Sequence, residues 1–150
     1  GSVLPEMISR GRGHIVAIAS IASVIGLPRM GTYCASKAAV VTQMNALAVD
    51  LKPLGIRVST VCPGFIETPL IKTHNQRLLI FKLSEDAANR IIAAIERGKR
   101  ISYFPWQTYW LARLGALLPF GLYARLMRRI TNRARQARLK NADPINSQPG

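Results

Sequence analysis

The chain has 150 residues, 49% of them hydrophobic, and a formal net charge of +14. This length suits a single domain with a core of its own, and the composition excludes a chain that is disordered throughout. The two cysteines and two histidines lack the spacing of a metal-binding motif, which excludes a zinc site and favours free, buried thiols over a disulfide.

The start of the chain lacks the basic flank, apolar core and cleavage site of a secretory signal peptide. We therefore interpret Gly1 as a cut in a longer protein and expect a cytoplasmic location. Within residues 1–12, apolar side chains three and four positions apart predict the last turns of an amphipathic helix. These side chains are Val3, Leu4, Met7 and Ile8.

An almost unbroken apolar run over residues 14–19 predicts a β-strand buried on both faces of a parallel sheet. Ser20 directly follows this run, at the carboxyl end of the strand, where open α/β sheets bind their ligands. Small residues together with Gly26, Pro28 and Gly31 predict a loop that brings the chain back over the strand ends.

A second helix is predicted over residues 32–51, where one apolar stripe recurs at helical spacing. The stripe consists of Val40, Met44, Leu47, Ala48 and Leu51. The sequence Lys-Pro-Leu-Gly at 52–55 ends this helix, because proline lacks a donor and glycine accepts a left-handed turn. Residues 56–61 then predict a second strand that runs parallel to the first.

Tyr33 and Lys37 are four residues apart, so on the predicted helix they lie on the same face. An ammonium one helical turn away favours the phenolate, which makes Tyr33 a usable proton donor and acceptor. The hydroxyl of Ser20, thirteen residues earlier, could hydrogen-bond the same substrate oxygen. Without the flanking segments, a capping serine, an interfacial tyrosine and a solvated lysine would be the simpler interpretation.

The segment after the second strand carries further turn and helix signals. Pro63-Gly64 turns the backbone at the carboxyl edge of the sheet, and residues 70–82 predict a mobile or weakly helical cover. A helix is predicted over residues 87–97, and residues 101–104 predict a short third strand.

From residue 105 the chain becomes aromatic, apolar and basic. Residues 97–140 hold eleven Arg or Lys and no Asp or Glu, so the basic excess belongs to the C-terminal third. A broad apolar and aromatic face precedes a break at Pro119 and Gly121, and an arginine-rich helix is predicted over 122–139. The face consists of Trp106, Tyr109, Trp110, Leu111, Leu114, Leu117 and Leu118.

Three features occur together in register along the first half of the chain. An apolar strand ends at Ser20, Tyr-x-x-x-Lys lies within YCASKAAV at 33–37, and a Pro-Gly turn follows at 63–64, 26 residues after the lysine. By these motifs the chain resembles the short-chain dehydrogenase/reductase family from about residue 1 to residue 69.

The resemblance implies an α/β fold, a partial Rossmann-like doubly wound parallel sheet, over residues 1–104. A helical, basic extension over 105–140 and a disordered tail over 141–150 complete the predicted organisation. The family's glycine-rich phosphate loop precedes the matched part, and residues 1–12 do not supply it. We therefore expect the chain to correspond to the C-terminal half of an enzyme, which by itself binds cofactor weakly or not at all.

The resemblance also implies roles for individual residues. Tyr33 is the general acid or base at the substrate oxygen, Ser20 orients that oxygen, and Lys37 activates the tyrosine and hydrogen-bonds the nicotinamide ribose. A turn beside the nicotinamide supplies further cofactor contacts, and no residue is expected to bind a metal. The expected cofactor-binding residues are Tyr33, Lys37, Pro63, Gly64, Ile66 and Thr68.

The predicted function is an oxidoreductase that transfers a hydride between NAD or NADP and a small-molecule carbonyl or secondary alcohol of lipophilic character. The parent enzyme is expected to be a homo-oligomer without a nucleic-acid partner. The alternative is a truncated, non-catalytic interaction module whose basic segment, residues 106–140, binds an anionic membrane surface, making the protein peripheral there. The aromatic face of this segment could instead pack on the domain.

Overall fold

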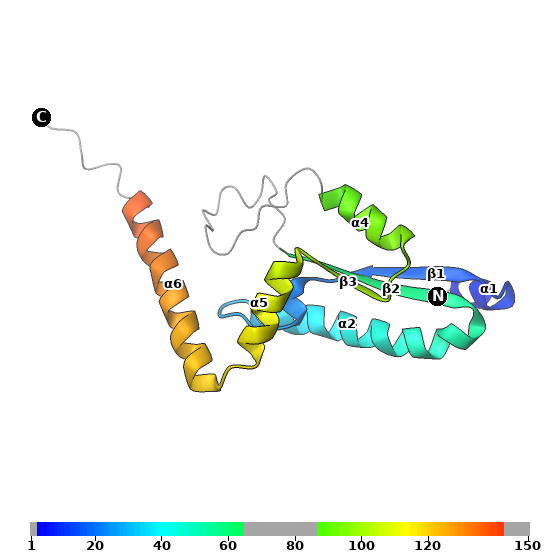
Figure 1. The fold of residues 1–150 in the computed structure, drawn as a ribbon, viewed down its shortest axis with the longest axis horizontal. Helices are drawn as coiled ribbons and strands as arrows, with labels where there is room; N and C mark the ends of the chain where they lie inside the picture. The colour runs from blue at the N-terminus through cyan, green and yellow to red at the C-terminus, as the bar shows by residue number, and fades with distance from the viewer. Residues whose placement is uncertain (1–2, 65–86, 143–150) are drawn as a thin grey trace, which may run out of the picture.

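The computed structural model describes residues 3–64 and 87–142, with side chains as far as residue 132. Three parallel strands form one sheet in the order β1 (Gly13–Ile18), β2 (Ile56–Pro63) and β3 (Ile101–Phe104). Figure 1 shows α2 (Gly31–Leu51) on one face of this sheet and α4 (Ala87–Glu96) on the other. This arrangement confirms the predicted α/β fold with helices on both faces of a parallel sheet.

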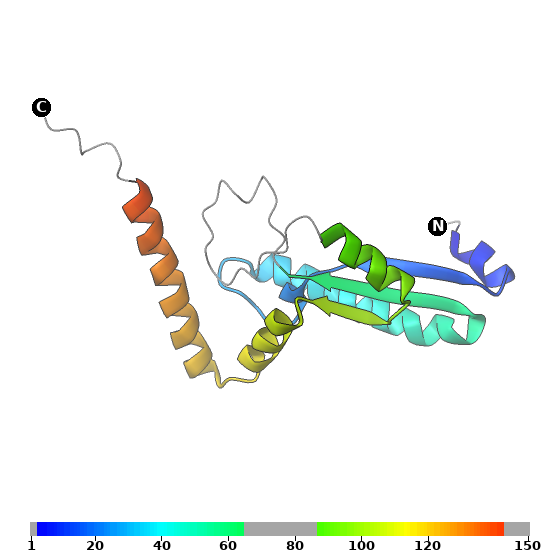
Figure 2. The same cartoon turned by 45° about the horizontal axis from the view of Figure 1, so that its top comes forward.

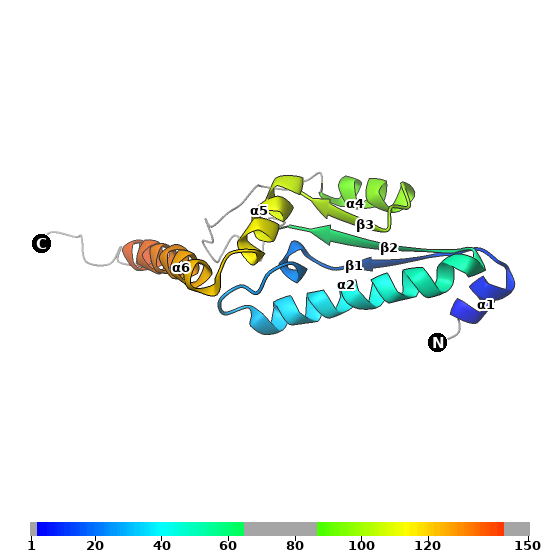
Figure 3. The ribbon, with the colours of Figure 1, turned by 60° about the horizontal axis from the view of Figure 1, so that its bottom comes forward.

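The core lies between α2 and the sheet, and Figure 3 shows α2 running along the sheet. Its buried centre consists of Met44, Leu51, Ile56 and Val58. The other members of the predicted helical stripe, Val40, Leu47 and Ala48, are partly buried and pack against this centre. The periodicity of the sequence therefore correctly identified both the helix and the face that it buries.

The most deeply buried strand is β2 and not β1. Ser59, Thr60 and Val61 are each 1% exposed, whereas the β1 residues are only half-buried and Ile18 is 46% exposed. The prediction that the run at 14–19 is buried on both faces is therefore wrong. The physical reason is position, because β2 has a strand on each side and helices on both faces, while β1 is an edge strand of the described sheet.

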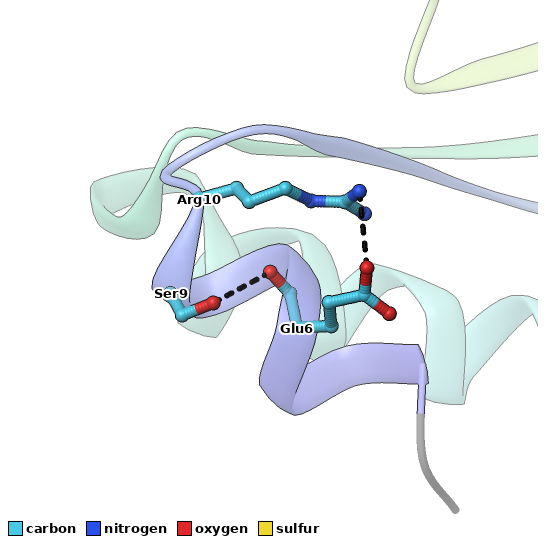
Figure 4. A network of polar contacts seen from close by, with 3 residues as sticks. All are labelled: Glu6, Ser9 and Arg10. Atoms are coloured by element: carbon cyan, nitrogen blue, oxygen red, sulfur yellow. Dashed lines mark hydrogen bonds and ion pairs between the residues drawn. The ribbon is translucent and has the colours of Figure 1, made fainter.

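Helix α1 (Val3–Ser9) confirms the predicted N-terminal helix, and its Leu4 and Met7 pack against the core. Figure 4 shows its polar face, where Arg10 forms an ion pair with Glu6 at 3.2 Å and Ser9 Oγ donates to the Glu6 carbonyl at 3.0 Å. Both partners of the ion pair are exposed, so it contributes little, about 0.3–0.5 kcal/mol.

Two glycine turns meet at the amino end of the sheet. The chain leaves α2 through the 3-10 helix η2 (Lys52–Leu54) and turns at Gly55, which has a left-handed φ of 75°. Gly11, before β1, also has a positive φ, of 61°. A Cβ on Gly55 would lie 2.1 Å from the Gly11 carbonyl oxygen, so the two turns can approach this closely only without a side chain at 55.

Helix α5 (Trp106–Ala116) follows β3 directly, and Tyr109 of α5 stacks on Tyr103 of β3 with ring centres 4.1 Å apart. Helix α6 (Phe120–Ala142) then projects away from the sheet beyond the carboxyl ends of the strands, as Figures 1 and 2 both show.

The boundaries of the C-terminal elements differ slightly from those predicted. Gly121 lies inside α6 and does not break the chain, and α6 continues through Asn141 and Ala142, which were assigned to the tail. The predicted cover at 70–82 and the rest of the predicted tail lie outside the described residues. No helix in the described part of the chain is long and apolar enough to cross a membrane.

Candidate active site

Ser20 lies at the carboxyl end of β1, where it caps the 3-10 helix η1 (Ile21–Ser23). Its backbone is extended, and its Oγ accepts a hydrogen bond from Ala22 N at 3.1 Å. Because this bond uses an oxygen lone pair, the hydroxyl proton remains available for donation to another acceptor. Ser20 is only 9% exposed, so the surrounding protein shields its hydroxyl from most of the solvent.

Tyr33 and Lys37 lie one turn apart on α2, with Lys37 Nζ 5.8 Å from the centre of the Tyr33 ring. This geometry confirms that the two side chains share a face. Lys37 Nζ also donates to the Ile18 carbonyl at 3.4 Å, which holds the ammonium at the carboxyl end of β1. Tyr33 is 43% exposed, so a small molecule can reach it.

The packing of η1 against α2 brings the serine and the tyrosine–lysine pair to the same edge of the sheet. Ser20 follows β1 after Ile18 and Ala19, and Ile18 is the residue whose carbonyl accepts from Lys37. The site therefore combines an oriented hydroxyl, an accessible phenol and a fixed ammonium. Such a set can hold a substrate oxygen and move a proton at it.

Cys62, which the sequence interpretation treated only as a buried thiol, lies directly against this set. Its thiol lies close to the Ser23 side chain, the Ser20 backbone and the Lys37 ammonium. Burial raises the pKa of the Cys62 thiol to about 11, and these three groups lower that pKa by smaller amounts. The thiol is therefore neutral at physiological pH and supports the backbone at Ser20 without acting as a nucleophile.

The contact between Cys62 and Ser20 follows from the register of the two strands. Ile18 of β1 pairs with Val61 of β2, and Ala19 N donates to the Val61 carbonyl at 2.8 Å. Ala19 and Ser20, which follow β1, therefore lie beside the last residues of β2, and this places Cys62 beside Ser20. Predicting this pairing requires the register, which the strand patterns alone do not define.

Burial of the thiols leads to a first prediction. Cys34 and Cys62 are both buried and free, so we expect each to react with an aromatic disulfide reagent at pH 8 about 100-fold more slowly than in the unfolded chain. A Cys34→Ser variant isolates the signal of Cys62. Rapid labelling of that variant under native conditions would contradict the packing of Cys62 against Ser20.

The turn after β2 is closely packed between η1 and the start of α5. Gly64 N donates to the Phe104 carbonyl at 2.7 Å, and Pro63 pairs with Phe104 in the sheet. A Cβ on Gly64 would lie 3.2 Å from Pro105 Cδ and 3.3 Å from Ile21 Cδ1. The backbone at Gly64 thus lies beside η1, at the same edge of the sheet as Ser20.

Two other predicted cofactor-binding residues, Ile66 and Thr68, lie outside the described residues. The structure places Ser20, Lys37 and the turn at 63–64 at one edge of the sheet, and Tyr33 beside Lys37 on α2.

The loop over residues 24–30, which links η1 to α2, contacts the C-terminal helices. The Tyr123 hydroxyl donates to the Gly26 carbonyl, and Ile25 Cδ1 lies 3.1 Å from the position of a Cβ on Gly115. The connection between α5 and α6 is therefore attached to the loop that follows Ser20. No pattern in the sequence indicated this contact, which joins residues 97 positions apart.

The donor set fits one half of a nicotinamide cofactor. Lys37 and Tyr33 offer a cation and a hydroxyl on one face, as a ribose requires, and the turn at Gly64 allows close approach of the backbone. The sequence holds no G-x-x-x-G-x-G loop, the motif that would bind a pyrophosphate at a helix N-terminus. Within the described ranges no group of three or more His, Cys, Asp or Glu is placed to hold a metal ion.

A family model described as short chain dehydrogenase matches residues 1–79 of the chain. An uncharacterised oxidoreductase of Myxococcus xanthus is 37% identical over 129 residues, which are 86% of this chain and 51% of that protein. Human estradiol 17-beta-dehydrogenase 11 is 31% identical over 131 residues, which are 85% of this chain and 44% of that protein. The chain thus spans about half the length of these relatives.

Solved structures show the same fold. A short chain dehydrogenase from Burkholderia cenocepacia in complex with NADP has a TM-score of 0.64 and 30% identity, over 82% of this chain and 50% of that one. A short-chain dehydrogenase from Sphingobium yanoikuyae in complex with NADPH has a TM-score of 0.61 over 99% of this chain and 52% of that one. Because the Sphingobium yanoikuyae structure is only 22% identical in sequence, its similarity to this chain supports the fold alone.

Proposed function

The chain belongs to the short-chain dehydrogenase family, and from this premise we propose that the protein that contains it is an NAD- or NADP-dependent oxidoreductase. Its proposed reaction transfers a hydride between the nicotinamide and a carbonyl or secondary alcohol. The observation that carries the proposal is the fixed pair on α2, where the Lys37 ammonium lies 5.8 Å from the ring of an accessible Tyr33.

In the proposed mechanism, Tyr33 exchanges the proton of the substrate oxygen. It accepts that proton when an alcohol is oxidised and returns it when a carbonyl is reduced, and the bound nicotinamide supplies the hydride acceptor or donor. The Ser20 hydroxyl donates to the same oxygen, since its lone pair is already engaged by Ala22 N. This bond stabilises the negative charge that develops on the oxygen.

Lys37 has two proposed roles. Its positive charge, 5.8 Å from the centre of the Tyr33 ring, stabilises the negative charge that develops as the proton moves. Its Nζ retains donors beyond the bond to the Ile18 carbonyl, and these can hold the nicotinamide ribose. Pro63 and Gly64, with Ile66 and Thr68 after them, are proposed to contact the cofactor.

The test of this function is cofactor oxidation by the purified protein as its gene expresses it. NADH and NADPH absorbance is followed with a panel of small and lipophilic ketones, and the reverse reaction with the matching secondary alcohols. Turnover that depends on both carbonyl and cofactor is expected. Absence of turnover with every pair, in protein that binds cofactor, would contradict the proposal.

A Lys37→Met variant provides a second prediction. Because the ammonium serves both proton transfer and ribose binding, we expect kcat to fall and the cofactor KM to rise, each by about tenfold or more. The matched control is Lys52→Met in η2, just beyond the far end of α2, which should change neither constant by more than about twofold. If Lys37→Met changes only one of the two constants, Lys37 has only one of the two proposed roles.

A second candidate function is favoured by the surface of α5 and α6. Trp106 and Trp110 are 64% and 54% exposed, so they do not pack on the described part of the domain. We propose that residues 106–140 attach the protein peripherally to an anionic membrane surface, which would also suit a lipophilic substrate. Equal recovery in the supernatant with neutral and phosphatidylserine-rich vesicles at low salt would overturn this attachment.

A further inference from the structure

The connection between α5 and α6 is a long uncharged stretch bounded by arginines. The eleven residues from 114 to 124 contain no charged side chain, whereas Arg113 precedes them and Arg125 follows them. Figures 1 and 2 show this stretch at the tip of a V formed by α5 and α6, away from the sheet. We name residues 114–124 the apolar corner.

The side chains of the apolar corner are largely exposed. Leu117 is 73% and Phe120 is 82% exposed, and the other large apolar side chains are also exposed. These others are Leu114, Leu118 and Leu122. An apolar cluster of this kind, rimmed by charges, marks an interaction site more often than ordinary surface.

A stripe of exposed side chains on α5 leads to the apolar corner. Trp106, Trp110 and Leu114 recur at helical spacing, so they lie on one face of α5, and the exposed Leu117 follows directly after the helix. Tyr109, on the inner side, stacks on Tyr103 and holds the helix to the sheet. The outer face of α5 is therefore free while its inner face is anchored.

Several backbone N–H groups of the apolar corner are hydrogen-bonded within the corner itself. Leu117 N donates to the Leu114 carbonyl and Leu118 N to the Gly115 carbonyl, while Leu122 N and Tyr123 N both donate to the Pro119 carbonyl. Pro119 has no N–H, and the Tyr123 hydroxyl is bound to the Gly26 carbonyl. Internal satisfaction of these polar groups is what burial in hydrocarbon demands.

Charge complementarity decides between the possible occupants. Arg113, Arg125, Arg128 and Arg129 are exposed around the apolar corner, and residues 97–142 contain no acid. A second copy of this chain docked face to face would bring these arginines against their own counterparts. An anionic lipid surface instead offers opposite charge at the level of the headgroups and hydrocarbon beneath them.

We propose that the apolar corner inserts into the outer layer of an anionic bilayer, with the tryptophans of α5 at the headgroup level and the flanking arginines on lipid phosphates. This inference rests on the proposed membrane attachment and assigns its inserting element. Insertion of about 5–10 Å is the depth at which an amphipathic surface segment lies. The loop over residues 24–30, bound to the apolar corner through Tyr123 and Gly26, then lies near the membrane.

The test compares two double variants that each remove two exposed apolar side chains. Leu117→Ser/Phe120→Ser alters the apolar corner, and Val49→Ser/Ile92→Ser alters exposed positions on α2 and α4. Partition onto phosphatidylserine-rich vesicles is expected to fall at least tenfold in the first variant and to stay within about twofold in the second. Thermal unfolding by circular dichroism checks that both variants remain folded.

The only two tryptophans of the chain, Trp106 and Trp110, report directly on α5. Their emission should shift to the blue and be quenched by brominated lipid in the wild type. Arg113→Gln/Arg125→Gln should weaken binding about tenfold and flatten its salt dependence, since each arginine near an anionic surface contributes. Lys52→Gln/Lys99→Gln, with the same loss of charge elsewhere, should bind as the wild type does.

The outcomes separate the two proposals. If the wild-type protein does not bind anionic vesicles, both the membrane attachment and the insertion of the apolar corner are contradicted. If the Leu117→Ser/Phe120→Ser variant binds vesicles as the wild type does, the insertion of the apolar corner is contradicted, but the proposed membrane attachment is not. If that variant converts an oligomer to a monomer in light scattering while vesicle binding is unchanged, the occupant is a second copy, and the corner proposal also fails. Hydride transfer with a water-soluble substrate should be equal in all these variants.

Discussion

Replacement of Tyr33 by phenylalanine is expected to lower the turnover number by about two to four orders of magnitude, because it removes the group that exchanges the substrate proton. Binding of the nicotinamide cofactor should weaken only slightly, since one hydroxyl is lost while the ammonium of Lys37 and the turn at Gly64 remain in place. The measurements are kcat by cofactor absorbance and cofactor affinity by fluorescence titration, on the protein that the gene expresses.

The matched control removes a phenol hydroxyl elsewhere. Tyr109→Phe keeps the ring that stacks on Tyr103 and should leave turnover within about threefold of the wild type. Burial raises the pKa of Tyr103 to about 12, so that phenol stays protonated and is a poor substitute for Tyr33. Turnover of Tyr33→Phe within threefold of the wild type would refute the assignment of the acid–base group.

The second large effect is expected on stability, from Gly55→Ala. An alanine at a φ of 75° carries strain of about 1–3 kcal/mol. Its Cβ would also lie 2.1 Å from the Gly11 carbonyl oxygen, so one of the two turns must move. We expect a loss of more than about 3 kcal/mol in the free energy of unfolding, measured by urea denaturation with circular dichroism.

Gly11→Ala separates the two contributions. Gly11 has a φ of 61°, close to that of Gly55, but a Cβ there would meet nothing within 4 Å. This variant should therefore lose only the strain, about 1–2 kcal/mol. Equal losses in both variants would mean that the contact between the two turns contributes nothing to stability.

The sequence by itself determined the local elements and the pair on α2. Apolar residues at helical spacing identified the helix that is observed as Gly31–Leu51, and the four-residue separation of Tyr33 and Lys37 then placed both on one face. The turn at Gly55 and the strand at Ile56–Pro63 followed from the same kind of local signal. These features depend on backbone geometry within a few residues, which spacing and turn chemistry specify.

Only the tertiary structure decided which apolar surfaces are covered. The run at 14–19 is the more apolar of the two in sequence, yet it is only half-buried at an edge, whereas the strand at Ile56–Pro63 is buried at the centre. Likewise, the outer face of α5 could have packed on the domain but is exposed. Burial depends on which elements become neighbours, and that information is not local.

The same reason separates the predicted part of the site from the part that the sequence missed. Ser20, Tyr33 and Lys37 were recognised because they belong to one continuous stretch between β1 and α2. Cys62 reaches Ser20 only through the pairing of two strands, and Tyr123 reaches Gly26 only through the path of α5 and α6. Contacts between residues so far apart in the chain depend on strand register and helix direction, which are properties of the assembled fold.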